Sequence, residues 1–156
     1  MDTLDDLVQR FIEKNAEEHA AINELDQKLE EIIQGQENKV KETALKLMPI
    51  MELIAEKGYR FKNPNSSWTS GKGPILKWDG GNLLYIFSIE KKHPITVNTD
   101  NEEIRAISYR NLLREVEFSQ IMDSLLRVLN HHDDLQREYQ ESIDAMEAEL
   151  REYDSI

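Results

Sequence analysis

Apolar side chains recur in alternating steps of four and three along residues 1–57. The series begins at Leu4, Val8 and Phe11, and its most regular part consists of four aliphatic residues, Ile22, Leu25, Leu29 and Ile32. Such steps place the side chains on one stripe of an α-helix, at the a and d positions of a coiled coil. The sequence therefore predicts a long helical arm, and we expect this arm to associate with further copies of the chain through its stripe.

The stripe contains polar positions and one break. Asn15, Glu18 and Gln36 occupy stripe positions. A buried Asn can fix the register of a coiled coil, and a loosely packed stretch is the simpler interpretation. The steps from Ile32 through Gln36 to Val40, where the stripe resumes, are all four, a pattern that locally unwinds a supercoil.

Pro49 lies inside the same helical pattern. A proline removes one helical hydrogen bond and clashes with the preceding turn, but it is tolerated in the first turn of a helix. Two alternatives therefore stay open: one helix kinked near Pro49, or two helices with the second beginning there.

The middle of the chain, residues 58–110, has a different composition. It holds five of the six glycines, three of the four prolines and both tryptophans. Strands are predicted over 59–62, 75–78, 83–89 and 95–97, with a loop over 63–74 that includes Pro64, a turn at Asp79-Gly80-Gly81-Asn82 and another turn over 91–94. The sequence predicts a small antiparallel β-meander of three or four strands.

Residues 99–110 allow two interpretations. Thr99 and Glu102 have the spacing of a capping box, so the last helix begins there in one of them. In the other, residues 104–109 form a final strand and the helix begins near Asn111.

Residues 111–156 predict a second helical arm. Its clearest stripe is the series Tyr139, Ile143, Met146, Leu150 and Tyr153. The predicted fold class is α+β: two long coiled-coil helices flanking a small antiparallel β-meander, with segments 1–57, 58–110 and 111–156 in a single structural unit. Two long helices joined by a compact module usually run antiparallel. The order of helix, strands and helix resembles the architecture of prefoldin subunits; the likeness is one of layout, without a shared sequence motif.

Charge separates the same three segments. The net charge of −12 divides into −7 over residues 1–57, +3 over 58–110 and −8 over 111–156. Acidic arms repel nucleic acid, so any contact with a polyanion is expected in the middle. The chain has no cysteine, an acidic first segment and no apolar run near the ~20 residues of a membrane span. We expect a soluble, cytoplasmic protein that does not bind membranes.

Candidate catalytic motifs are weak. Gly71-Lys72-Gly73 lacks the first glycine and the hydroxyl of a phosphate loop, since Ser66 and Gly73 stand at those places. His131 and Asp134 share a helix face, but two ligands are too few for a dedicated metal site. No G-x-S-x-G elbow occurs. We therefore expect no enzyme activity, no metal and no cofactor.

Basic and aromatic residues interleave in the middle segment. The partner-binding candidates are Arg60, Lys62, Trp68, Lys72, Lys77, Trp78, Lys91 and Lys92. Trp and Arg are enriched in protein-binding hot spots, which favours a protein partner anchored by Trp68 or Trp78. Basic residues beside exposed aromatics also suit nucleic acid.

These patterns predict a non-enzymatic binding module that self-associates into a dimer or larger oligomer and presents its middle to a macromolecular partner. The self-association candidates are Ile22, Leu25, Leu29, Ile32, Ile143, Met146 and Leu150. One alternative is an acidic inhibitor, of the kind that phages encode, which mimics nucleic acid in the groove of a nucleic-acid-processing enzyme. The other is direct binding of nucleic acid by the basic middle.

Overall fold

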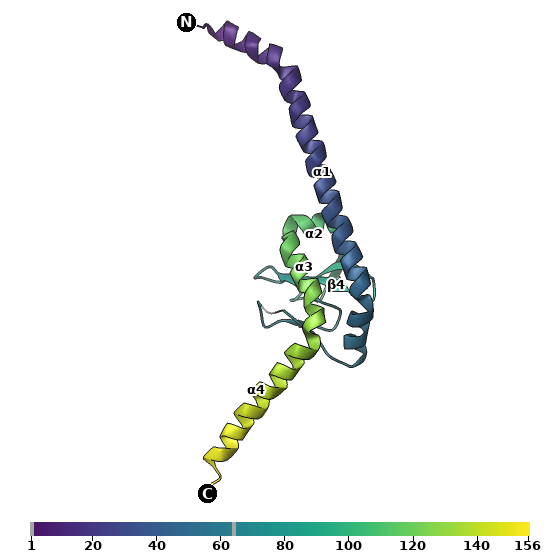
Figure 1. The fold of residues 1–156 in the computed structure, drawn as a ribbon, viewed down its shortest axis with the longest axis vertical. Coiled ribbons are helices and arrows are strands. Elements are labelled where there is room, and N and C mark those ends of the chain that lie inside the picture. Colours follow the sequence, from purple (N-terminus) through teal and green to yellow (C-terminus); the bar gives the residue numbers. More distant parts are fainter. Residues whose placement is uncertain (1, 64) are drawn as a thin grey trace. The chain divides into compact units, whose positions relative to one another are not determined.

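The computed structural model describes residues 2–63 and 65–156, so Pro64 in the predicted 63–74 loop lies outside the described residues. The chain is α+β (Figure 1). In order, its elements are α1 (Leu4–Glu56), β1 (Phe61–Lys62), β2 (Thr69–Ser70), β3 (Ile75–Trp78), β4 (Leu83–Ser88), β5 (His93–Asn98), β6 (Ile104–Ala106), α2 (Tyr109–Glu115), α3 (Phe118–Leu126), the 3₁₀ turn η1 (Arg127–Asn130) and α4 (His131–Glu152).

Helix α1 is a single element of 53 residues. Its start is capped reciprocally: Asp6 N–H donates to Thr3 Oγ1, and Thr3 N–H donates to Asp6 Oδ2, each at 3.2 Å. The helix continues through Pro49, which decides between the two alternatives for this arm in favour of one helix. Proline removes only one hydrogen bond here, and the burial of Met48 and Met51 beside it offsets that loss.

The chain divides into two compact units, residues 1–39 and 40–156. In the first unit every residue from Asp2 to Ile32 is exposed. In the second unit the last part of α1 belongs to the core, where the stripe positions Val40, Ala44, Leu47, Met51 and Ile54 are buried. The expectation that the self-association stripe resumes at Val40 is therefore wrong, because these side chains pack inside the chain's own module.

The strands form two antiparallel sheets. One is the pair β1–β2, and the other has the order β3-β4-β5-β6. The predicted meander is confirmed, with differences at its edges: β2 falls inside the predicted 63–74 loop, and β5 begins at His93, inside the predicted 91–94 turn. Residues 104–106 are a strand and α2 begins at Tyr109, so the strand interpretation of this stretch holds and no helix begins at Thr99.

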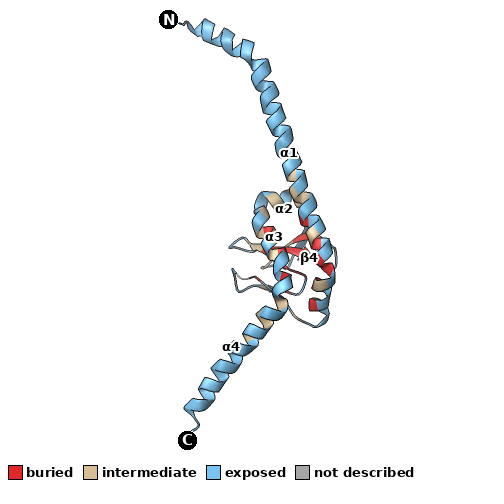
Figure 2. Cartoon of the chain, in the orientation of Figure 1, coloured by how far each residue is buried: buried red, intermediate tan, exposed pale blue. Residues whose placement is uncertain are grey.

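Strand β4 separates two hydrophobic clusters because its side chains alternate between the sheet's faces. Tyr85 and Phe87 pack with buried residues of α1, α2 and α3. Leu84 and Ile86 face the other way, in a cluster with Ile75, Ile95, Trp78 and Val97. Figure 2 shows the buried residues gathered where α1, α2 and α3 meet the sheet.

The C-terminal arm is shorter than predicted. Instead of one helix over 111–156, the chain forms α2, α3, η1 and then α4, which has 22 residues. The break lies at Val116 and Glu117, whose backbones are extended. Val116 is buried together with Leu112, Ile121 and Leu125, so these residues of α2 and α3 belong to the core of the module and only α4 remains as an arm. Among the described helices, none has the length and apolar character that a bilayer span requires.

Candidate interaction surfaces

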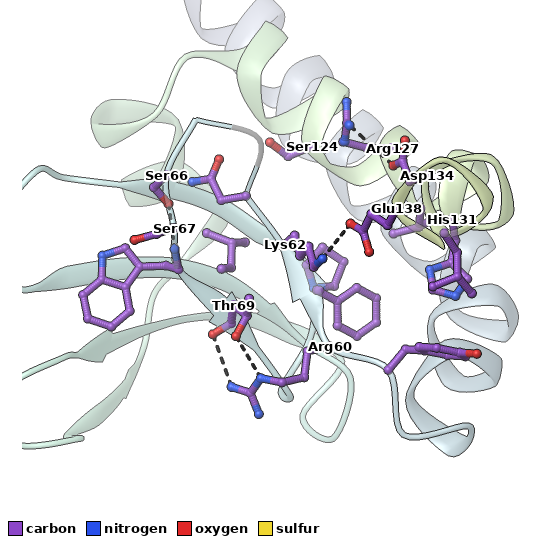
Figure 3. Close-up of a pocket in the computed structure, with 18 of the residues that line it drawn as sticks. Arg60, Lys62, Ser66, Ser67, Thr69, Ser124, Arg127, His131, Asp134 and Glu138 are labelled. Atoms are coloured by element: carbon purple, nitrogen blue, oxygen red, sulfur yellow. Dashed lines mark hydrogen bonds and ion pairs between the residues drawn. The ribbon is translucent and has the colours of Figure 1, made fainter. Parts of the chain in front are cut away.

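A groove of about 690 Å³ lies between the β1–β2 hairpin and the helical turns around the start of α4. Its lining includes residues from both sides, among them Arg60, Lys62, Trp68, His131, Leu135 and Glu138. Three of the predicted partner-binding residues, Arg60, Lys62 and Trp68, are therefore brought to one place. Figure 3 shows Lys62 of the hairpin pointing toward Glu138 of α4.

The cationic side chains of this groove have partners within the chain. Lys62 Nζ lies 2.6 Å from Glu138 Oε1. Arg60 donates from Nε to Thr69 Oγ1 at 2.9 Å and from a terminal nitrogen to the Thr69 carbonyl at 3.3 Å (Figure 3). Asp134 lies 3.4 Å from Arg127 and 3.5 Å from Arg137. The Lys62–Glu138 pair connects α4 to the hairpin, whereas Arg60 bonds within the hairpin and Asp134 pairs on the helical side.

His131 stands at the junction of α4 with the module. Its ring meets the ring of Tyr59 edge to face, with centroids 5.0 Å apart. Burial lowers the pKa of His131, helped by His132 and Lys57 and opposed by Asp134 and Glu138. This environment therefore disfavours the charged form of the ring, which packs against Tyr59. The described residues contain no group of three or more side chains that could hold a metal ion.

The two tryptophans form a pair beside the groove. Their ring centroids are 6.4 Å apart, with the planes inclined by 59°. Trp78 is half-buried in the cluster that holds Leu84, and its Nε1 donates to the Gly81 carbonyl at 2.9 Å. Trp68 is more exposed, at 37%. One ring is therefore fixed by the fold and the other presents its surface.

The other four predicted lysines do not line the groove. Lys77 Nζ donates to the carbonyl of Glu115, the last residue of α2, at 2.9 Å. Lys91 and Lys92 form the turn between β4 and β5, and the Lys72 carbonyl accepts from Ile89 N–H near that turn. Lys72, Lys91 and Lys92 are exposed. The eight predicted residues thus separate into the groove side chains, the tryptophan pair, the β3 lysine that donates to α2, and an exposed lysine group at a sheet end.

All the predicted self-association residues are exposed. Ile22, Leu25, Leu29 and Ile32 of α1 are 51–68% exposed, and Ile143, Met146 and Leu150 of α4 are 47–69% exposed. Figure 2 shows both helical segments pale along their length. Their apolar side chains are not part of either hydrophobic cluster of the module.

Sequence reasoning missed the α4 side of the groove. Arg127, Asp134 and Glu138 lie more than fifty residues after the hairpin, and no local pattern connects them to Lys62. It also missed Leu135, which lines the groove and lies one turn before Tyr139 on the same face of α4. The four-residue step from Leu135 to Tyr139 was the available signal.

The chain matches no protein-family model, no curated protein and no solved structure. Its fold and its surfaces therefore carry the functional argument. The features that can be assigned chemically are an exposed apolar stripe on α1, a second one on α4, and a groove with an exposed tryptophan between the hairpin and α4.

Proposed function

We propose that this protein is a non-enzymatic binding module that self-associates through residues 4–36 of α1 and binds a protein partner beside Trp68. The observation that carries the proposal is the uncovered stripe on α1. Large apolar side chains stand at Leu4, Val8, Phe11, Ile22, Leu25, Leu29 and Ile32, all of them exposed in the chain. Apolar patches of this extent usually mark an interaction surface.

The flanks of this stripe suit a second copy. With Val8, Asn15, Ile22 and Leu29 at a, the flanking e and g positions hold Asp5, Leu7, Ile12, Lys14, His19, Ala21, Asp26, Lys28, Ile33 and Gly35. Two acids and two lysines balance there, although the arm as a whole is acidic. The remaining acids, apart from Glu18 in the stripe, lie at outward positions. Apart from Glu18, like charges are thus kept away from a self-pairing interface.

Trp68 supports a protein partner rather than a nucleic acid. An exposed tryptophan at the edge of a groove is the kind of residue that anchors protein interfaces. The groove cations Arg60 and Lys62 already contact Thr69 and Glu138, and Asp134 and Glu138 add negative charge to the lining. Phosphates would have to displace these contacts.

The mass of the full chain in solution tests the self-association. Light scattering at micromolar concentration should give a multiple of 18.3 kDa. A mass of one chain across this concentration range would contradict the proposal.

The tryptophan pair tests the partner surface. In affinity capture from the native cell, Trp68→Ala should weaken retention of the partner by about 2 kcal/mol, roughly thirtyfold, with little loss of stability. Trp78→Ala should instead lower the stability by about 2 kcal/mol, less than for a fully buried tryptophan. Equal retention by Trp68→Ala and the wild type would place the partner elsewhere. Charge reversal at Lys91 and Lys92 is the control: a polyanionic partner would be lost in a salt-dependent manner.

A further inference from the structure

Helix α4 carries a second uncovered stripe that differs from the stripe on α1. Every residue from Tyr139 to Ile156 is exposed. Within this segment Tyr139, Ile143, Met146, Leu150 and Tyr153 follow each other in steps of four and three, so they form one apolar face about two heptads long. The face continues at its N-terminal end into Leu135 and the groove.

The residues beside this stripe are acidic. When Ile143 and Leu150 are placed at a, three of the flanking e and g positions hold acids, namely Glu147, Glu149 and Asp154. The two remaining e and g positions beside the stripe hold Gln140 and Ser142. Among these three acids, Glu147 has an ion pair in the described structure. Its partner, Arg151, lies 3.6 Å away and occupies an outward position of the helix. The flanks of the stripe are therefore negative, without the lysines that balance the α1 stripe.

Pairing of two α4 helices would bring like charges together. In a parallel pair Glu149 faces Asp154 of the second copy. In an antiparallel pair the e positions face e positions and the g positions face g positions, so glutamates meet glutamates. Like charges at flanking positions disfavour a pairing, and this is how coiled coils exclude wrong partners.

We infer that the α4 stripe docks a basic amphipathic helix of another protein and does not form part of the self-association seam. Aliphatic side chains of that helix cover the stripe, and its lysines or arginines pair with Glu147, Glu149 and Asp154. An apolar helix face docked on an apolar surface, with complementary charges at the edges, is a common mode of peptide recognition. The inference rests on the proposed binding role and names the chemistry of the partner.

The length of the stripe defines the size of the partner segment. Fourteen residues separate Tyr139 from Tyr153. At a rise of about 1.5 Å per residue the stripe is about 21 Å long, which matches a helix of roughly 15 residues. A longer helix would continue past Leu135 toward the groove.

The experiment uses the full chain and two synthetic peptides of three heptads labelled with fluorescein. Both peptides have Leu at a and d; one has Lys at all e and g positions, and the other has Glu there. Fluorescence anisotropy at physiological salt should show the Lys peptide binding at least tenfold more tightly than the Glu peptide. Equal binding of the two peptides, or no binding of the Lys peptide, would overturn the inference.

Matched charge reversals locate the binding. Glu147→Lys with Glu149→Lys should weaken binding of the Lys peptide at least tenfold. Asp144→Lys with Glu152→Lys changes the net charge equally at outward positions of the same helix and should leave the affinity within twofold. Equal loss in both double variants would indicate general attraction to an acidic surface and would overturn the inference. Circular dichroism confirms that each variant keeps its helix content.

The mass of the assembly, measured for the wild type and for the charge-reversal variants, shows whether docking on α4 and self-association through α1 are independent. The double variant at Glu147 and Glu149 should keep the mass of the wild type. If it dissociates the assembly, α4 belongs to the seam and the inference is wrong while the self-association stands. If the chain has the mass of a single copy but binds the Lys peptide in the pattern above, the self-association fails and the docking surface on α4 stands.

Discussion

The arm of α1 and the exposed part of α4 carry the same kind of apolar stripe with different neighbours. On α1 the flanking charges are Asp5, Asp26, Lys14 and Lys28, which balance. On α4 all three flanking charges are negative, while both segments are acidic overall. The comparison teaches that net charge says little about what an amphipathic helix binds. The few positions beside the apolar seam decide which partner is tolerated.

The two stripes also end differently at the module. The α1 stripe continues into Val40, Ala44 and Met51, which are buried in the core. The α4 stripe continues into Leu135, which lines the open groove. The last part of α1 is therefore a structural element of the module, whereas the start of α4 belongs to a surface that a partner can reach.

The largest effect is expected from shortening two leucines of the α1 stripe. Leu25→Ala with Leu29→Ala should weaken the proposed assembly by about 4 kcal/mol or more, roughly a thousandfold, because each leucine is exposed in the single chain and would be buried on self-association. Sedimentation or light scattering over a concentration series measures the shift. The melting of the module should not change, and an unchanged mass would remove this face from the seam.

The matched change on α4 sharpens the comparison. Ile143→Ala with Leu150→Ala removes a similar apolar area, but the mass of the assembly should remain that of the wild type. The reason is that the acidic residues beside the α4 stripe would repel those of a second copy. The same variant should lose affinity for the Lys-flanked peptide. A fall in mass comparable with that of the α1 variant would show that the two stripes are equivalent.

A smaller effect is expected at the polar seam position Asn15. Asn15→Leu places an apolar side chain at an a position, and burying a leucine contributes about 2 kcal/mol. We expect a tighter assembly by about that amount per chain, with a loss of register or oligomer specificity that a seam asparagine can supply. Asn38→Leu, on the exposed surface of the same helix, is the control. If Asn15→Leu leaves the dissociation constant unchanged, residue 15 lies outside the seam.

The smallest effect concerns His131, where α4 joins the module. Burial lowers the pKa of His131, so the unfolded chain binds a proton at a higher pH than the folded chain does. Stability should therefore fall as the pH drops below about 6.5, by less than about 1 kcal/mol because the ring is half exposed. Thermal unfolding at pH 7.5 and 5.5 measures this, and His131→Gln should reduce the difference.

The sequence predicted the elements well where a local pattern decides them. Steps of four and three identified α1, and Asp79-Gly80-Gly81-Asn82 identified the β3–β4 turn, in which the Asp79 carboxylate accepts from Gly81 and Leu83 N–H groups. The same steps did not show which apolar residues face the module. Val40 and Ile32 look alike along the chain, but only Val40 is buried in the core of the module, and that burial depends on residues far away in sequence.

The candidate site was predictable only on its hairpin side. Trp68 and the bases Arg60 and Lys62 could be proposed from their interleaving, and they do line one groove. Glu138, which pairs with Lys62, and Asp134, which pairs with Arg127 and Arg137, could not be proposed in the same way, because acids are abundant in 111–156. The break at Val116 was also hidden, since a valine at a stripe position fits a helix until long-range packing makes the extended backbone more favourable.

The edges of the four-stranded sheet have a consequence for behaviour at high concentration. At one edge, β6 has only three residues, and the Arg105 side chain at its centre lies 2.9 Å from Glu103. At the other edge, Ser124 of α3 donates to the Leu76 carbonyl at 3.4 Å. Short, charged or covered edges resist the addition of foreign strands. The module should therefore stay free of amyloid-like growth when the chain is concentrated, even where the helical stripes crowd many copies together.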